Sequence, residues 1–135
     1  MTRAEAKDVL LREFISVYGT TTPVAYENNE AFIKPTDAPW VRFLIQENTS
    51  DQKTIGGVGN RRYQRPGLIS YQVFIPNNTG TYEGNLLCEQ INDIFEGNRF
   101  GEITCWTGSW IEVGINSQDL YQFNGSIPWE FDQTK

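Results

Sequence analysis

Two stretches of the sequence carry apolar residues at the spacing of an amphipathic helix. The first begins at the capping box Thr2-x-x-Glu5, whose hydroxyl and carboxylate can satisfy free backbone amides, and it ends at Gly19. The second spans about Tyr82 to Phe95 and is ended by Gly97. The apolar positions are Ala6, Val9, Leu10, Phe14, Val17 and Tyr18 in the first stretch and Leu87, Cys88, Ile91, Ile94 and Phe95 in the second. We therefore predict two helices, each with one buried face.

The rest of the regular pattern is the two-residue alternation that is typical of β-strands. It is clearest in residues 40–46 and in Gly67–Ile75, where Pro76 ends the run. Gly108 lies between two shorter runs and predicts a tight hairpin. The other expected strands are residues 22–27, a short strand within the polar segment 48–60, and residues 102–106, 110–115 and 120–126. The order α-β-β-β-β-α-β-β-β predicts an α+β fold, with two helices packed on a largely antiparallel, mixed sheet in a single domain over residues 1–135.

Composition excludes much of catalytic chemistry. The 135 residues include no His and only two Cys, Cys88 and Cys105, which we expect to be small buried hydrophobes. Imidazole-based catalysis, His-containing zinc sites and four-thiolate sites are therefore excluded. We predict that the protein is not an enzyme and needs neither metal nor cofactor. The charged N-terminal residues and the lack of an apolar run of about 20 residues predict a protein with no membrane partner, made in the cytoplasm.

The glycine-rich segment Ile55–Arg62 is a candidate phosphate-binding loop. A Walker loop needs Gly-Lys-Ser/Thr at its end, and a dinucleotide-binding loop needs a helix after the glycines. Neither follows here, because the next residues are Arg61-Arg62-Tyr63-Gln64-Arg65-Pro66 and then a strand. Two interpretations stay open: a flexible hairpin tip, or an ordered loop whose arginines bind carboxylates of another chain.

The charges are unevenly distributed along the chain, whose formal net charge is -6. Residues 42–65 hold five basic and two acidic residues, a balance of +3, whereas residues 66–135 hold two basic and nine acidic residues, a balance of -7. Two complementary patches suit head-to-tail contact between identical subunits, although ordinary solvated charges would give the same counts. Nucleic-acid binding is disfavoured, because one short basic cluster faces repulsion from an acidic remainder.

Over about residues 3–125 the chain resembles the siphophage tail terminators related to the lambda tail protein U. The resemblance is carried by the N-terminal helix, by Trp40-Val41-Arg42-Phe43, by the run from Ile55-Gly56-Gly57-Val58-Gly59 to Gly67, by Gln72-Val73-Phe74-Ile75-Pro76 and by Thr79-Gly80. It implies a virion protein without catalytic residues that forms a hexameric ring on the head-proximal end of the tail tube. Such a ring stops tube polymerisation and offers a surface to head-completion (neck) proteins, with genomic DNA only as passing cargo.

Two sets of residues follow as candidate sites. We expect the loop from Gly56 to Gly67 to contact a neighbouring subunit or the tube, and its candidate residues are Gly56, Gly57, Gly59, Arg61, Arg62, Tyr63 and Arg65. Because packaged duplex must pass through the ring, we expect acidic residues to face the channel, and the candidates are Glu83, Glu89, Glu102 and Glu112. The alternative function is a small adaptor or binding module, either a head-tail neck component or a protein that uses the Arg61–Arg65 segment to bind an acidic partner or nucleic acid.

Overall fold

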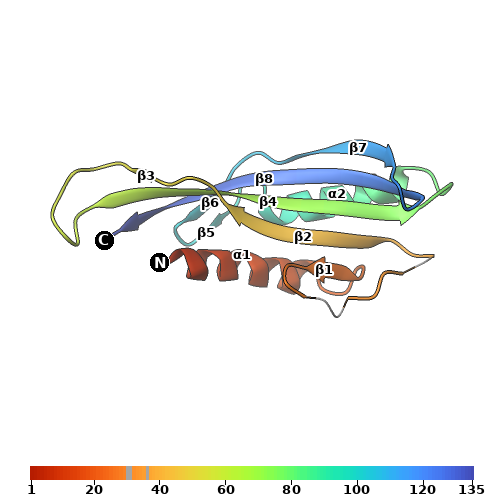
Figure 1. The fold of residues 1–135 in the computed structure, drawn as a ribbon, viewed down its shortest axis with the longest axis horizontal. Helices are drawn as coiled ribbons and strands as arrows, with labels where there is room; N and C mark the ends of the chain where they lie inside the picture. Colours follow the sequence, from red (N-terminus) through yellow and green to blue (C-terminus); the bar gives the residue numbers. More distant parts are fainter. Residues whose placement is uncertain (30–31, 36) are drawn as a thin grey trace.

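A computed structural model describes residues 1–29, 32–35 and 37–135 and shows one eight-stranded sheet with two helices on one face (Figure 1). The helices are α1 (Arg3–Tyr18) and α2 (Tyr82–Phe95). The strands are β1 (Val24–Tyr26), β2 (Trp40–Glu47), β3 (Asp51–Gln52), β4 (Arg62–Pro76), β5 (Arg99–Phe100), β6 (Ile103–Cys105), β7 (Ser109–Ile115) and β8 (Leu120–Thr134). The α+β class and the element order are confirmed, with β5 as an additional strand that the sequence pattern did not predict.

The sheet is mixed, as predicted, because β1 runs parallel to β2 while the other pairs are antiparallel. Its strand order is β1-β2-β4-β8-β6-β5, with β3 on the edge of β4 and β7 on the edge of β8. The hairpin predicted at Gly108 is wrong, since β6 and β7 each pair with β8. Gly108 instead lies against the side chains of Asn92 and Ile127, where a β-carbon would overlap them, and its amide donates to Glu96.

The first helix forms as its capping box predicts. The Thr2 hydroxyl accepts a hydrogen bond from the Glu5 amide at 3.1 Å, and Gly19 ends α1 with a φ of +57°. One predicted core residue is misplaced: Val17 is 58% exposed, because it lies at the last turn of α1, where the helix borders an open pocket. Within the described residues, neither helix is long and apolar enough to cross a membrane.

The core lies between the helices and one face of the sheet. Phe14 of α1 stacks on Phe43 of β2, with ring centroids 3.9 Å apart, and Phe95 of α2 packs beside both rings. Alternate residues of the long strands complete the layer, and they are Val41, Phe43 and Ile45 of β2, Ile69, Tyr71, Val73 and Ile75 of β4, and Phe123, Ile127, Trp129 and Phe131 of β8. The residues between them face the other side of the sheet, which no helix covers (Figure 1).

Two strands are longer than the sequence pattern predicted. β4 begins at Arg62 rather than at Gly67, and β8 continues past Ser126 to Thr134. Pro66 does not interrupt β4. Its carbonyl points towards the edge of β4 that pairs with β2, and there it accepts a hydrogen bond of 2.9 Å from the amide of Asn48, the first residue after β2. The N–H group that proline lacks would point to the same edge, at the position between the residues paired with β2 and those paired with β3. No hydrogen bond between strands is therefore lost at Pro66.

Candidate functional site

The loop that joins β3 to β4 projects from one end of the sheet, and we call residues 53–61 the arm. In Figure 1 the arm extends past both chain termini and away from the two helices. Its base is clamped to the C-terminal residue, because the Arg61 amide donates to the Lys135 carbonyl and the Lys135 amide donates to the Arg61 carbonyl. The base of the arm is thus held in place by backbone pairing beyond the end of β8.

Internal hydrogen bonds give the arm a specific shape. The Asn60 amide donates to the Gly57 carbonyl at 3.0 Å, and Arg61 Nε donates to the Gly56 carbonyl at 3.1 Å. Gly59 adopts a φ of +91°, which favours glycine. Both interpretations of this segment, the flexible hairpin tip and the ordered loop that binds another chain, stay open.

The chemistry at the tip of the arm is apolar and basic. Ile55 is completely exposed and Val58 is 85% exposed, although aliphatic side chains gain free energy when they leave water. Lys53 and Arg61 are the charged residues of the arm, which therefore has a charge of +2. The arm thus presents two exposed aliphatic side chains and two positive charges to solvent.

The other predicted loop arginines lie in β4. Arg62 Nε donates to the Asp132 carboxylate of β8 at 2.9 Å. Arg65 is only 8% exposed; its guanidinium lies 4.8 Å from the Tyr63 ring centroid, and its Nε donates to Gln133. The prediction that this half of the segment is loop is wrong, since the strand pairs with β8 throughout. Within the described part of the chain, Arg61 makes no ion pair.

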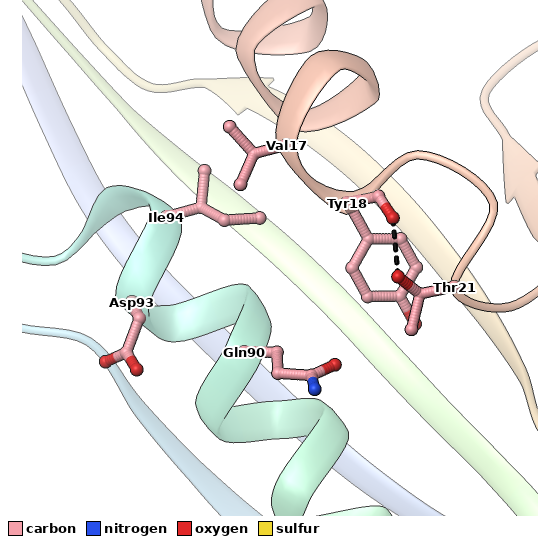
Figure 2. Close-up of a pocket in the computed structure, with 6 residues that line it drawn as sticks. All are labelled: Val17, Tyr18, Thr21, Gln90, Asp93 and Ile94. Atoms are coloured by element: carbon pink, nitrogen blue, oxygen red, sulfur yellow. Dashed lines mark hydrogen bonds between the residues drawn. The ribbon is translucent and has the colours of Figure 1, made fainter.

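A pocket of about 370 Å³ opens between the two helices, and we call it the helix pocket (Figure 2). Figure 2 shows Val17 and Ile94 close together on one side, Tyr18 and Thr21 on the other and Gln90 below them, with Asp93 on the outer side of α2; all six residues line the pocket. The Thr21 hydroxyl donates to the Tyr18 carbonyl at 2.6 Å, which fixes the turn after α1. The pocket therefore combines aliphatic walls with an acidic edge.

The surface of α2 around this pocket is acidic. Residues 82–96 hold four acidic and no basic side chains, and the four are Glu83, Glu89, Asp93 and Glu96. All four are exposed. The helix layer consequently has a charge opposite to that of the arm.

The four channel candidates do not form one surface. Glu83 and Glu89 lie on α2, and Glu112 of β7 accepts a hydrogen bond from Asn85 of the same helix. Glu102 lies on the turn between β5 and β6, 4.0 Å from the amino nitrogen of Met1. Figure 1 places that turn towards the end of the sheet that carries the arm.

The uncovered face of the sheet is a second broad surface that the sequence analysis did not identify. Its centre is mostly polar, and its residues are Arg42, Leu44, Gln46, Ser70, Gln72, Gln122, Asn124 and Ser126, with Arg42 donating a hydrogen bond to Gln72. One end of this face is covered by chain that precedes β2: Trp40 stacks on Phe74, with ring centroids 4.2 Å apart, Phe32 and Lys34 pack against Trp40, and both stacked rings are buried. The two-residue alternation of polar and apolar positions in residues 120–131 was the signal that could have revealed this face.

Neither thiol is available as a nucleophile. Cys88 and Cys105 are buried in the core, and burial raises the pKa of each thiol to about 12, with the Glu112 carboxylate adding to the effect at Cys88. Within residues 1–29, 32–35 and 37–135, no three His, Cys, Asp or Glu side chains gather in a metal-binding group.

The structure is an α+β fold with a projecting basic arm and an acidic helix layer. The chain belongs to the phage tail terminator family, whose profile, described as phage tail terminator protein, matches residues 7–129. No curated protein matches the chain. Among seven matching chains of solved structures, one has a TM-score of 0.64 and 15% sequence identity over 95% of this chain and 96% of that chain, which shows the fold alone.

Proposed function

We propose that this protein is the tail terminator of a phage, forming a ring on the head-proximal end of the tail tube. In this role it stops the addition of tube subunits and offers a surface to the head-completion or neck protein. The family match over residues 7–129 carries the proposal. The expected ring is a hexamer, and the expected partners are the tube protein below the ring and the neck protein above it.

The geometry of the arm supports a role in assembly. Ile55 and Val58 are fully or almost fully exposed on a hydrogen-bonded loop, so a contact with another chain there would remove apolar surface from water. A structural role of this kind requires no catalytic group, cofactor or metal. DNA is then cargo that passes through the ring rather than a ligand.

The adaptor alternative loses support from the positions of the arginines. A binder of acidic partners needs free guanidinium groups, but Arg62 is paired with Asp132 and Arg65 is buried against Tyr63. Only Lys53 and Arg61 remain on the arm. We therefore retain the terminator as the proposed function.

The proposal is tested by deleting the gene from the phage and imaging the lysate. Without the protein, tube subunits should add beyond the normal length, and filled heads should remain unjoined. The control is the same deletion complemented by the wild-type chain. Tails of normal length joined to full heads in the uncomplemented lysate would disprove the proposed function.

A further inference from the structure

We infer that the arm of one copy docks in the helix pocket of the next copy, with Ile55 and Val58 covering Val17 and Ile94. This inference rests on the proposed ring and names the contact that would hold it together. The pocket is thus occupied by residues 53–61 of a second copy of this chain, and the tests below follow these residues.

The arm cannot fill the pocket of its own chain. Its base is fixed by the paired backbone hydrogen bonds between Arg61 and Lys135 and by the ion pair between Arg62 and Asp132. From there it points away from the helix layer, beyond both termini (Figure 1). A contact between arm and pocket is therefore intermolecular.

Both the arm and the helix pocket present aliphatic side chains to solvent. The arm presents two aliphatic side chains to water, and the pocket presents Val17, which is 58% exposed on the last turn of α1. Figure 2 shows the Val17 and Ile94 side chains directed towards each other across the gap between the helices. A pocket of about 370 Å³ has room for an aliphatic side chain from the arm. Docking would remove apolar surface of both copies from water.

The charges also match, and this sets the orientation. Lys53 and Arg61 give the arm a charge of +2 with no acidic residue between them. At the pocket, Asp93 is one of the lining residues and Glu89 precedes it by one helical turn, on a helix without Lys or Arg. Arg61 has no carboxylate partner in the described part of its own chain, so Asp93 of a neighbouring copy is a suitable one.

The arm and the pocket are different patches on one molecule, so the contact is heterologous. Each copy inserts its arm into one neighbour and receives the arm of the other. A repeated contact of this kind forms a closed ring when the rotation from one copy to the next divides a full turn evenly. The arrangement would explain why a basic segment and an acidic helix occur in the same chain without pairing inside it.

Disulfide trapping tests the contact in assembled particles. The two natural thiols are buried in the core, so a Val58→Cys, Gln90→Cys variant carries one new exposed thiol on the arm and one at the pocket. The matched control is Val58→Cys, Gln46→Cys, because Gln46 is also an exposed glutamine but lies on the uncovered face of the sheet. Particles assembled with each variant are oxidised and analysed on a non-reducing gel.

We expect the Val58–Gln90 pair to give a ladder of covalent multimers that reduction abolishes, and the Val58–Gln46 pair to stay monomeric on the gel. Assembled particles with no ladder from the first pair, or with equal ladders from both pairs, would overturn the docking while leaving the terminator function standing. Normal tails in the gene deletion would instead overturn the function itself.

A charge exchange gives an independent test if the cysteine variants fail to assemble. Arg61→Asp and Asp93→Arg should each lower the yield of joined particles at least tenfold, and the combination should restore most of it because the pair is re-formed in reverse. Far-ultraviolet circular dichroism of each purified variant checks that folding is unchanged. A combined variant no better than either single variant contradicts the contact.

Discussion

Gly84 of α2 lies directly against the ring of Phe123 on β8, so closely that a β-carbon at position 84 would overlap the ring. Phe123 is fully buried, and its ring is also packed beside Tyr121. The absence of a side chain at Gly84 thus sets how close the first turn of α2 sits to the sheet. The position of this helix matters for the proposed assembly, because α2 carries one wall of the helix pocket.

Replacing Gly84 with Ala should destabilise the fold. The added methyl group must displace either the helix or the Phe123 ring, and overpacking of this kind costs about 1–3 kcal/mol of unfolding free energy. Urea denaturation followed by circular dichroism measures the change. The control is Gly57→Ala on the arm, where no atom lies within 4 Å of the added carbon. Equal stability of the two variants would contradict the close packing.

Arg65 and Arg61 should behave differently when each is changed to Ala. Arg65 is buried, stacks on Tyr63 and donates to Gln133, so its loss should lower the unfolding free energy by about 1.5–3 kcal/mol. Arg61→Ala should change stability by less than about 0.5 kcal/mol, because its side chain bonds only to the exposed arm. Thermal melts of the two purified variants separate these roles, and the reverse order of stabilities would refute them.

The stability of the fold should fall in alkali. Burial raises the pKa of Cys88 and Cys105 from 9.0 to about 12, and that of Tyr18 from 10.0 to about 12. The unfolded chain loses the two thiol protons above about pH 9 and the Tyr18 proton above about pH 10, while the folded chain keeps all three. Stability that is fully present below pH 9 therefore declines as the pH rises towards 12, and it declines more steeply above pH 10. Each group contributes a slope of about 1.4 kcal/mol per pH unit once it is ionised in the unfolded chain.

Urea denaturation at several pH values from 8 to 11 measures this slope. A Cys105→Ala variant is the control, because it should be less stable at pH 8 and show a shallower decline above pH 9. An unfolding free energy that stays constant from pH 8 to 11 would show that the thiols and Tyr18 titrate normally in the folded protein.

Charge reversal separates two roles of the acidic residues. Glu89→Lys places a positive charge one helical turn from Asp93 and should reduce the yield of joined particles by repelling the arm. Glu102→Lys changes a residue far from the pocket, so particles should form, and slow DNA ejection would place it on the channel. Fluorescence of ejected DNA gives the rate. Slow ejection from normally assembled Glu89→Lys particles would assign that residue to the channel instead.

Both helices could be predicted from the sequence because their signals are local. The Thr2 capping box, the Gly19 stop and the apolar spacing of α2 each act within a few residues, and the structure confirms them. The alternation in β2 and in the second half of β4 was equally clear. The face that each of these elements buries therefore followed from residue spacing alone, except at Val17.

The remaining features depend on partners that are distant in the sequence. Pro66 indicates a strand break, but β4 continues through it because β8 pairs along its whole length and Asn48 faces the proline carbonyl. The same pairing buries Arg65, which local sequence places on an exposed loop. The helix pocket was also unpredictable, since it requires the end of α1 and the middle of α2 to lie side by side. The charge imbalance did indicate two complementary patches, although not their positions.

The central position of β8 has a consequence for the timing of synthesis. β8 is the last strand along the chain, and it lies between β4 on one side and β6 and β7 on the other. Until the ribosome has delivered residues 120–134, β4 lacks its longest neighbour and the arm lacks its clamp at Lys135. Pairings between such distant residues form slowly. If the proposed ring is held by the arm, a nascent chain should thus be unable to offer a clamped arm to a neighbour until translation has passed residue 135.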